Sequence, residues 1–326
     1  RVSTSHPEVF GLNPTNIYSL ETNGSQYKEI TFDLGMNAET LWGDKLLYSA
    51  MLGHKFASEE IPYTITESGD VHNWFSGHSN AGYWLVNDSP FRSIAPLDGF
   101  SIRLLLRGGV DTEKVRINFG QPTLSSLPDR IELGAWSLGH IYDMPHSPDL
   151  NLKLSYEYDG VKTIQTKGGA TLSNASYTKP ADWGDAGAWQ LSGVPNHRSG
   201  RRSWDLSFSY LSDTDVFPTS AHTEFHIPYK GTGVPIFDSD SDEYNWGVDA
   251  HSDGTFTPYG ILTSTDFFSQ VWNRTMGGHL PFIFQPDKNN NNPDQFAIAR
   301  FDQSSLQYEQ VANNVYNVKL KIRECW

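Results

Sequence analysis

The stretch DFFSQVWNRTMGGHLPFIF, residues 266–284, decides the fold of the second half of the chain. Four apolar residues recur at helical spacing along its first part, two of them less regularly than the others: Phe267, Phe268, Val271 and Trp272. Thr265 or Asp266 can cap the start of such a helix, and Gly277-Gly278 can end it. The pattern therefore predicts a short helix with an aromatic face, followed directly by a strand.

Residues 281–284 begin that strand, and a long turn rich in Asn, Pro and Asp follows over residues 286–294. Residues 296–301 and 316–323 then alternate apolar with polar side chains, as half-buried antiparallel strands do. A helix that lies across such a sheet, without a cluster of reactive side chains, is typical of a scaffold.

This block resembles the C-terminal half of distal-tail and tail-tube-fold proteins of tailed phages. The matching residues are Phe267, Phe268, Gly277, Gly278, Pro281, Phe282, Phe284, Pro286, Asp287, Phe296 and residues 316–323. Residues 143–149 and 200–210 resemble segments of virion structural proteins of marine phages, so the likeness covers residues 131–326. It implies a ring subunit that closes, in sixfold symmetry, around a DNA channel.

The first part of the chain shows short strands over residues 29–34, 46–56, 100–109 and 115–120, separated by Gly, Pro and Asp turns. This spacing predicts a β-sandwich or jelly roll. The segments LGHKF and FSIRL are similar to galactose-binding-like sandwiches of phage tail proteins. The sequence thus predicts a mainly β protein with a galactose-binding-like sandwich over residues 1–122. A tail-tube-like domain with one short helix follows over residues 123–326.

Three local features refine the second domain. Residues 121–129, with two prolines, are the best linker, and residues 212–264, with weak periodicity, are expected to form an insertion loop. Asp159-Gly160 is the strongest hairpin signal, between strands at residues 152–158 and 161–166. In the strand at residues 204–211, alternation places four residues on one face: Trp204, Leu206, Phe208 and Tyr210.

Composition narrows the functional classes. Twenty-four basic residues against 38 acidic ones give a net charge of −14, which argues against a basic nucleic-acid-binding surface. DNA is therefore expected only as passing cargo, in a tube whose negative lining would let it slide. No apolar run approaches the ~20 residues of a membrane span. Cys325 is the single cysteine, which fits assembly in the reducing cytoplasm of a host before incorporation into the virion tail.

Motifs for metal binding or catalysis are incomplete. The calcium-loop-like run Asp238-x-Asp240-x-Asp242 has Glu243 where the loop needs Gly, so a solvated acidic loop is expected. His222 and His226 are read as surface residues, and residues 77–82 miss the Gly-x-Ser-x-Gly elbow by one position. No cofactor, metal or catalytic residue is assigned.

Two aromatic groups bear on recognition instead. Four residues in a loop rich in Gly, Ser and Asn form a candidate glycan-binding set, because sugar faces stack on aromatic rings: Trp74, His78, Tyr83 and Trp84. Packing of these rings under the sandwich or into a neighbouring subunit is the favoured alternative. Trp183 and Trp189 lie in a glycine-rich loop and are read, with the Asp159-Gly160 hairpin, as contacts between subunits.

The sequence therefore predicts a structural component of a phage tail. The chain would be a subunit of a distal-tail or baseplate ring whose partners are copies of itself, in a hexamer, and other tail proteins. Two alternatives remain open: a tail adhesin that binds host surface glycans, and a tail enzyme that degrades glycans.

Overall fold

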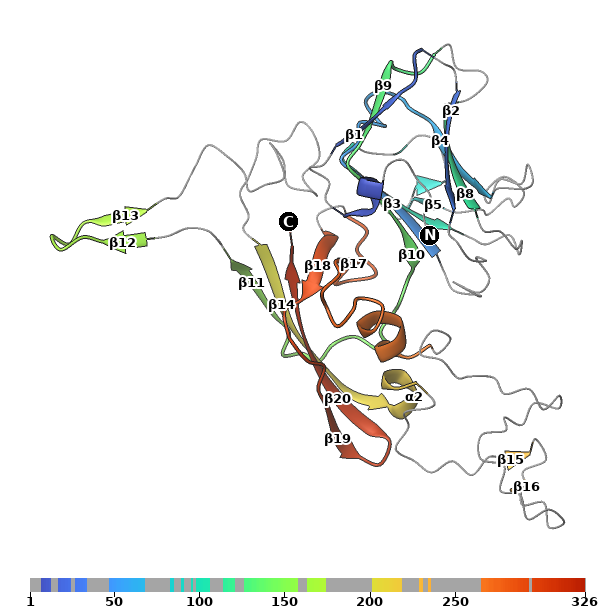
Figure 1. Cartoon of the computed structure of the whole chain (residues 1–326). Coiled ribbons are helices and arrows are strands. Elements are labelled where there is room, and N and C mark those ends of the chain that lie inside the picture. Colours follow the sequence, from blue (N-terminus) through green and yellow to red (C-terminus); the bar gives the residue numbers. More distant parts are fainter. Residues whose placement is uncertain are drawn as a thin grey trace.

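The computed structural model describes residues 7–12, 17–24, 27–33, 47–67, 83–84, 89–90, 95, 98–105, 114–120, 126–157, 163–173, 201–218, 229–230, 234–235, 265–292 and 295–325. Over these residues the chain is mainly β, as predicted, and every pairing between strands is antiparallel (Figure 1).

Three sheets make up the N-terminal part. Their orders are β1-β9, β2-β8-β4 and β10-β3-β7-β5-β6. The strands are β1 (Tyr18–Glu21), β2 (Tyr27–Asp33), β3 (Leu47–Leu52), β4 (Tyr63–Glu67), β5 (Tyr83–Trp84), β6 (Ser89–Pro90), β7 (Phe100–Leu105), β8 (Lys114–Gly120), β9 (Arg130–Leu133) and β10 (Ala135–His140). A 3₁₀ turn, η1 (Pro7–Phe10), places the ring of Phe10 5.4 Å from that of Trp136.

Strand β3 is buried on both faces because apolar residues occupy both sets of its alternating positions. Leu47 and Met51 face the N-terminal core, where they join Phe56, Tyr63 and Trp136. Ala50 and Leu52 point to the opposite face, into a second buried cluster. Its members are Ala50, Leu52, Phe100, Ile102, Ala135, Phe296 and Ile298. The five-stranded sheet is therefore a middle layer of the molecule.

The C-terminal part is a six-stranded sheet in the order β11-β14-β20-β18-β17, with β19 also pairing with β20. Its strands are β11 (Lys153–Glu157), β14 (Arg201–Ser212), β17 (Phe282–Phe284), β18 (Ala297–Phe301), β19 (Tyr308–Ala312) and β20 (Val315–Glu324). Two short pairs are separate, β12 (Thr163–Gln165) with β13 (Thr171–Ser173), and β15 (Tyr229–Lys230) with β16 (Val234–Pro235). One short helix, α2 (Asp213–Val216), follows β14.

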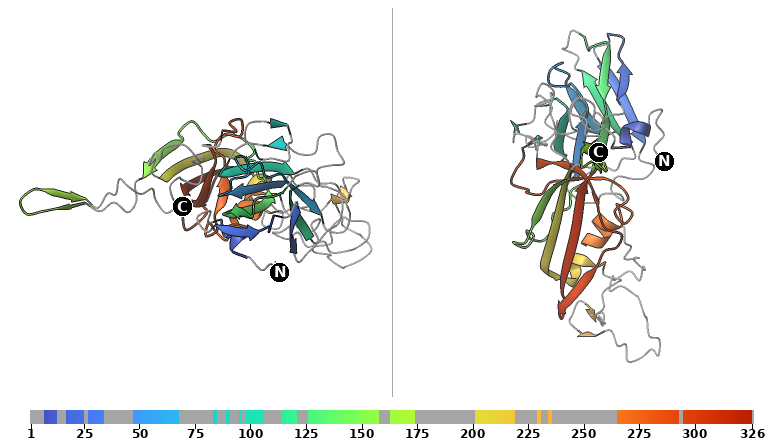
Figure 2. Two further views of the ribbon diagram at one scale, coloured as in Figure 1. Left: turned by 90° about the horizontal axis from the view of Figure 1, so that it is seen from above. Right: turned by 90° about the vertical axis from the view of Figure 1, so that its left-hand side faces the viewer.

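Strand β18 joins the two parts. Ala297, Ala299 and Phe301 face the C-terminal core, whereas Ile298 faces the cluster shared with β3 and β7. The rings of Phe100 and Phe296 meet there at 5.3 Å. The long C-terminal sheet consequently lies below the N-terminal sheets in Figure 1 and in the right-hand view of Figure 2.

The domain boundary expected at residues 122–123 does not follow the pairing of the strands. Strand β9 pairs with β1 and β10 pairs with β3, so residues 130–140 belong to the N-terminal sheets. The described end of the expected linker is also fixed there, since Leu127 is buried in the N-terminal core and the Thr22 N–H donates to the Asp129 carbonyl at 3.0 Å. Gly134 separates β9 from β10, and the two strands enter different sheets.

The helix predicted over residues 266–276 exists as a wider turn, η4 (Phe268–Trp272), with π-type bonds. The Asn273 N–H donates to the Phe268 carbonyl at 2.8 Å, five residues back. In an α-helix residues five apart lie about 140° from each other around the axis, and the wider turn reduces that angle. Phe267 and Trp272 can therefore both reach the ring of Phe301, at 6.3 and 5.2 Å.

Both predicted ends of this helical segment are confirmed. The carboxylate of Asp266 accepts the Ser269 N–H at 2.9 Å, as an N-cap does. Gly277 and Gly278 end the turn with φ of 67° and 91°. At Gly278 a Cβ would lie 2.8 Å from the Cβ of Phe301, so the close approach to β18 also requires glycine.

Two predictions for the C-terminal strands are wrong. Residues 152–158 and 161–166 do not form a hairpin with each other, because β11 pairs with β14, and β12 pairs with β13. Alternation along β14 buries Trp204, Leu206 and Phe208, but a β-bulge after Phe208 turns Tyr210 outward and places Leu211 in the core.

Candidate functional site

His54 is a fully buried titratable side chain that packs against the N-terminal core. Its Nδ1 accepts the Phe56 N–H at 3.3 Å, so the ring proton lies on Nε2, 2.9 Å from the Ser101 hydroxyl. Its ring also stacks on Phe56 at 4.2 Å. Burial lowers the pKa of His54 to about 3, against a smaller opposing effect of the Asp98 carboxylate. The imidazole is therefore a neutral, enclosed part of the core.

We expect His54 to make the protein sensitive to acid. Its pKa is lower in the folded chain than its ordinary value of 6.5, so between pH 6.5 and 3 the unfolded chain binds a proton that the folded chain does not. The free energy of unfolding should fall by roughly 2 to 3 kcal/mol from pH 6.5 to 4.5 through this group alone. Urea titrations of the wild type and of His54→Gln at both pH values measure it. An equal fall in the two proteins would exclude this role.

A second set of titratable groups lies beside the helical turns of the C-terminal part. Burial raises the pKa of Tyr142 and of Tyr308, and the carboxylate of Asp266 adds to both effects. Asp215 also raises the pKa of Tyr142. Both carboxylates accept backbone N–H groups at the starts of helical turns. Asp215 accepts the Ser212 N–H, and Asp266 accepts the Ser269 N–H. These groups cap and pack, and among the described residues no set of three His, Cys, Asp or Glu side chains could hold a metal ion.

Arg202 and Glu324 form a largely buried ion pair between β14 and β20. Nη2 of Arg202 lies 3.1 Å from Oε1 of Glu324, and Oε2 accepts the Arg202 backbone N–H at 2.9 Å. The same Nη2 donates to the Phe296 carbonyl at 2.7 Å. The pair therefore ties the end of the C-terminal sheet to the segment that enters the shared core, which is a structural role.

Strand β11 leaves part of the inner face of the C-terminal sheet uncovered. Leu154 lies opposite Trp204, and Tyr156 lies opposite Arg202, so both face the same side as the C-terminal core. Trp204 is buried, yet Leu154 is 46 % exposed and Tyr156 is 55 % exposed. Among the described strands β11 is also the end of the sheet. This strand has the features of an incomplete edge.

The hairpin β12–β13 forms an arm that projects from the body (Figures 1 and 2). Ile164 and Leu172 face each other across its two strands and are 64 % and 58 % exposed. The turn is closed by the Thr166 N–H, which donates to the Ala170 carbonyl at 2.8 Å. A two-stranded hairpin is marginally stable in water, so an arm with one apolar face is suited to a partner surface.

The outer face of the C-terminal sheet carries charges of both signs. Nζ of Lys321 lies 2.9 Å from Asp302, and Arg323 lies 2.9 Å from Glu157. Over the described strands, these acidic and basic side chains pair with each other on this face.

Most of the site residues predicted from the sequence lie outside the residues that the structure describes. Tyr83 and Trp84 form β5, which pairs with β6 and β7, but their side chains are not described. The remaining ones lie outside the described residues: Trp74, His78, Asp159, Gly160, Trp183 and Trp189. Most of the expected loop at residues 212–264 also lies outside them, and its start forms α2.

The exposed apolar residues of β11 and of the arm were not singled out by the sequence. Their alternation signals strands, but it does not show which face stays uncovered after folding. In the described part of the chain no helix is long and apolar enough to cross a membrane. Comparison with protein-family models, with curated proteins and with solved structures finds no match for this chain.

Proposed function

We propose that this chain is a structural subunit of a phage tail, in a distal-tail or baseplate ring. Copies of the chain assemble with one another, in a sixfold ring around the DNA channel, and with other tail proteins. The N-terminal layers act as a galactose-binding-like sandwich, and the C-terminal sheet acts as a tail-tube-like domain. The proposal begins from the resemblance of residues 131–326 to such proteins.

The uncovered edge at β11 carries the proposal. Among the described strands β11 ends its sheet, and a strand from a neighbouring copy that paired with it would cover Leu154 and Tyr156. Unprotected edges of this kind invite uncontrolled aggregation, and closure into a ring removes them. A scaffold role also fits the titratable groups described above, because His54 is enclosed in a core and Asp215 and Asp266 cap helical turns.

The oligomeric state tests the proposal directly. We expect mass photometry to show rings of the wild type and single subunits of the double variant Leu154→Asp/Tyr156→Asp, because two carboxylates would have to be buried at the contact. Both side chains are half exposed, so the variant should fold, and its thermal unfolding checks this. Ser155→Asp, on the opposite face of β11, is the matched control and should still form rings.

A wild-type protein that stays a single subunit at every concentration would overturn the proposal. Two assays on the same protein then distinguish the glycan-binding adhesin from the glycan-degrading enzyme. Sugar-specific signal on a glycan array that Trp74→Ala loses would indicate an adhesin, and release of reducing sugar from host polysaccharide would indicate an enzyme.

A further inference from the structure

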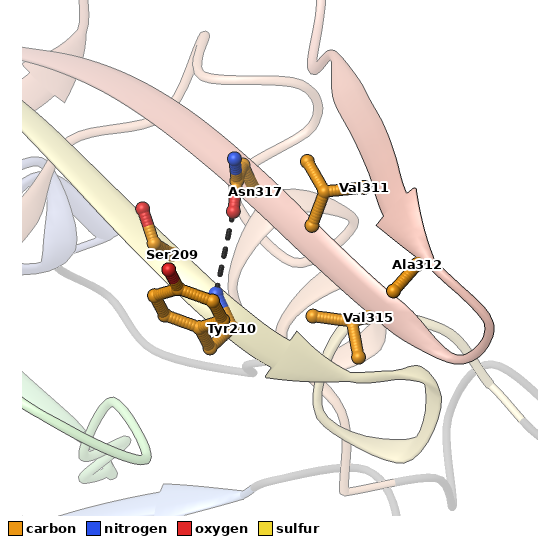
Figure 3. Close-up of a pocket in the computed structure, with 6 residues that line it drawn as sticks. All are labelled: Ser209, Tyr210, Val311, Ala312, Val315 and Asn317. Atoms are coloured by element: carbon orange, nitrogen blue, oxygen red, sulfur yellow. Dashed lines mark hydrogen bonds between the residues drawn. The ribbon is translucent and has the colours of Figure 1, made fainter.

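A shallow hollow lies at the far end of the C-terminal sheet, where β14 ends and β19 meets β20 (Figure 3). Its volume is about 360 Å³, room for more than one aliphatic side chain. Six residues line it: Ser209, Tyr210, Val311, Ala312, Val315 and Asn317. Tyr210 is 82 % exposed and Val311 is 47 % exposed, so the hollow is an apolar surface open to solvent.

Tyr210 is held in this hollow in an unfavourable backbone conformation. Its φ is 62°, in the left-handed region, where a bulky side chain costs about 1 to 2 kcal/mol. The bulge in β14 turns the ring away from the core, and the Tyr210 N–H donates to Oδ1 of Asn317 at 3.3 Å. The ring is 82 % exposed, so this strain does not contribute to the packing of the subunit. Bulges commonly re-aim a side chain for a function outside the sheet.

We infer that this hollow receives the apolar face of the β12–β13 arm from a second copy of the chain. This inference rests on the proposed function and names a contact within the assembly. Ile164 and Leu172 are the exposed pair on that face, and in the hollow they would pack against Tyr210 and Val311. The arm extends from the end of the sheet opposite the hollow in Figures 1 and 2, so it serves a different copy.

Charge favours this occupant. Lys167, in the turn of the arm, is the one charged residue among residues 163–173. Two acidic residues flank the hollow. The Asp149 carboxylate accepts the Ser209 hydroxyl at 2.7 Å, and Glu309 lies opposite Asn317 in the pair of β19 and β20. Lys319 lies further along β20. That bond, the largest of several effects, lowers the pKa of Asp149 and keeps its carboxylate charged. A cationic turn with an aliphatic face therefore meets an apolar hollow with acidic flanks.

The two surfaces differ, so each copy would give an arm and receive one. Such a head-to-tail contact repeats from copy to copy and closes into a ring when the rotation between neighbours permits. The contact would also stabilise the arm itself, which has no core of its own.

Disulfide trapping tests the contact. In a Cys325→Ser background, one protein carries Leu172→Cys and another carries Val311→Cys. We expect the oxidised equimolar mixture to give cross-linked dimers, a single protein with both cysteines to give a ladder, and Thr171→Cys, on the opposite face of the arm, to give neither. Absence of a cross-link in samples that mass photometry shows to be rings would overturn this inference alone. Single subunits throughout would overturn the proposed function as well.

A second variant separates contact from folding. Tyr210→Gly removes the ring and suits a φ of 62°, so the subunit should be as stable as the wild type or more stable. Loss of a central aromatic contact should nevertheless weaken assembly by about tenfold or more. Unchanged assembly of this variant would count against the hollow as the docking surface.

Discussion

Replacement of Glu324 by alanine should lower the free energy of unfolding by about 3 to 5 kcal/mol, as expected when one partner of a buried ion pair is removed. Glu324 is almost fully buried, and its carboxylate accepts two bonds from the Arg202 side chain and one from the Arg202 backbone. Without it, the guanidinium keeps its desolvation but loses the adjacent charge. Urea unfolding followed by tryptophan fluorescence measures the change.

The exposed pair of Lys321 and Asp302 on the same sheet provides the control. Its side chains are both about two-fifths exposed, so Asp302→Ala should cost under about 1 kcal/mol. The double variant Arg202→Met/Glu324→Leu should regain most of the loss, because apolar replacement of both partners removes the uncompensated charge. A Glu324→Ala effect no larger than that of Asp302→Ala would show that the pair is not effectively buried.

Replacement of Phe296 by alanine should cost about 3 to 5 kcal/mol and divide a single unfolding transition into two. Its ring is buried between β7 and β18, 5.3 Å from Phe100, in the cluster that joins the N-terminal and C-terminal sheets. A cavity there weakens the contact between the two parts while each keeps its own core. Differential scanning calorimetry separates the transitions.

Phe208→Ala is the matched control because its ring is equally buried but lies in the C-terminal core alone. It should lower stability by a similar amount, and unfolding should remain a single transition. Identical thermograms for the two variants would contradict the coupling assigned to Phe296.

Local signals predicted the C-terminal elements well. Asp266 and the Gly277-Gly278 pair mark the ends of the helical segment because caps and left-handed glycines act within a few residues. Alternation likewise located β18 and β20 to within a residue or two, since one side of each must meet the core. The wider π turn was not visible, because it depends on the position of Phe301 in another strand.

The errors concern contacts between distant residues. Asp159-Gly160 is a strong local turn signal, but β14 supplies twelve residues for β11 to pair with, and the arm turns later at residues 166–170. Tyr210 continues the alternation of β14, and only the register with β20 shows that a bulge removes it from the core. At the described end of the expected linker, Leu127 is buried among strands that lie far away in the chain, and its local sequence does not show this.

The candidate assembly surfaces could not be predicted for the same reason. Leu154 and Tyr156 read as ordinary inward residues of a half-buried strand, and their exposure follows from what fails to cover them. The hollow forms where β14, β19 and β20 meet, and no single segment of the sequence predicts that meeting.

The burial of β3 on both faces has a consequence for biosynthesis. Ala50, Leu52 and Ile102 are covered by Phe296 and Ile298, which leave the ribosome about 200 residues later. At ordinary elongation rates that interval is roughly 10 to 40 s. During it the apolar face that Phe296 and Ile298 later cover stays open to solvent, and we expect chaperones that bind nascent chains to contact it.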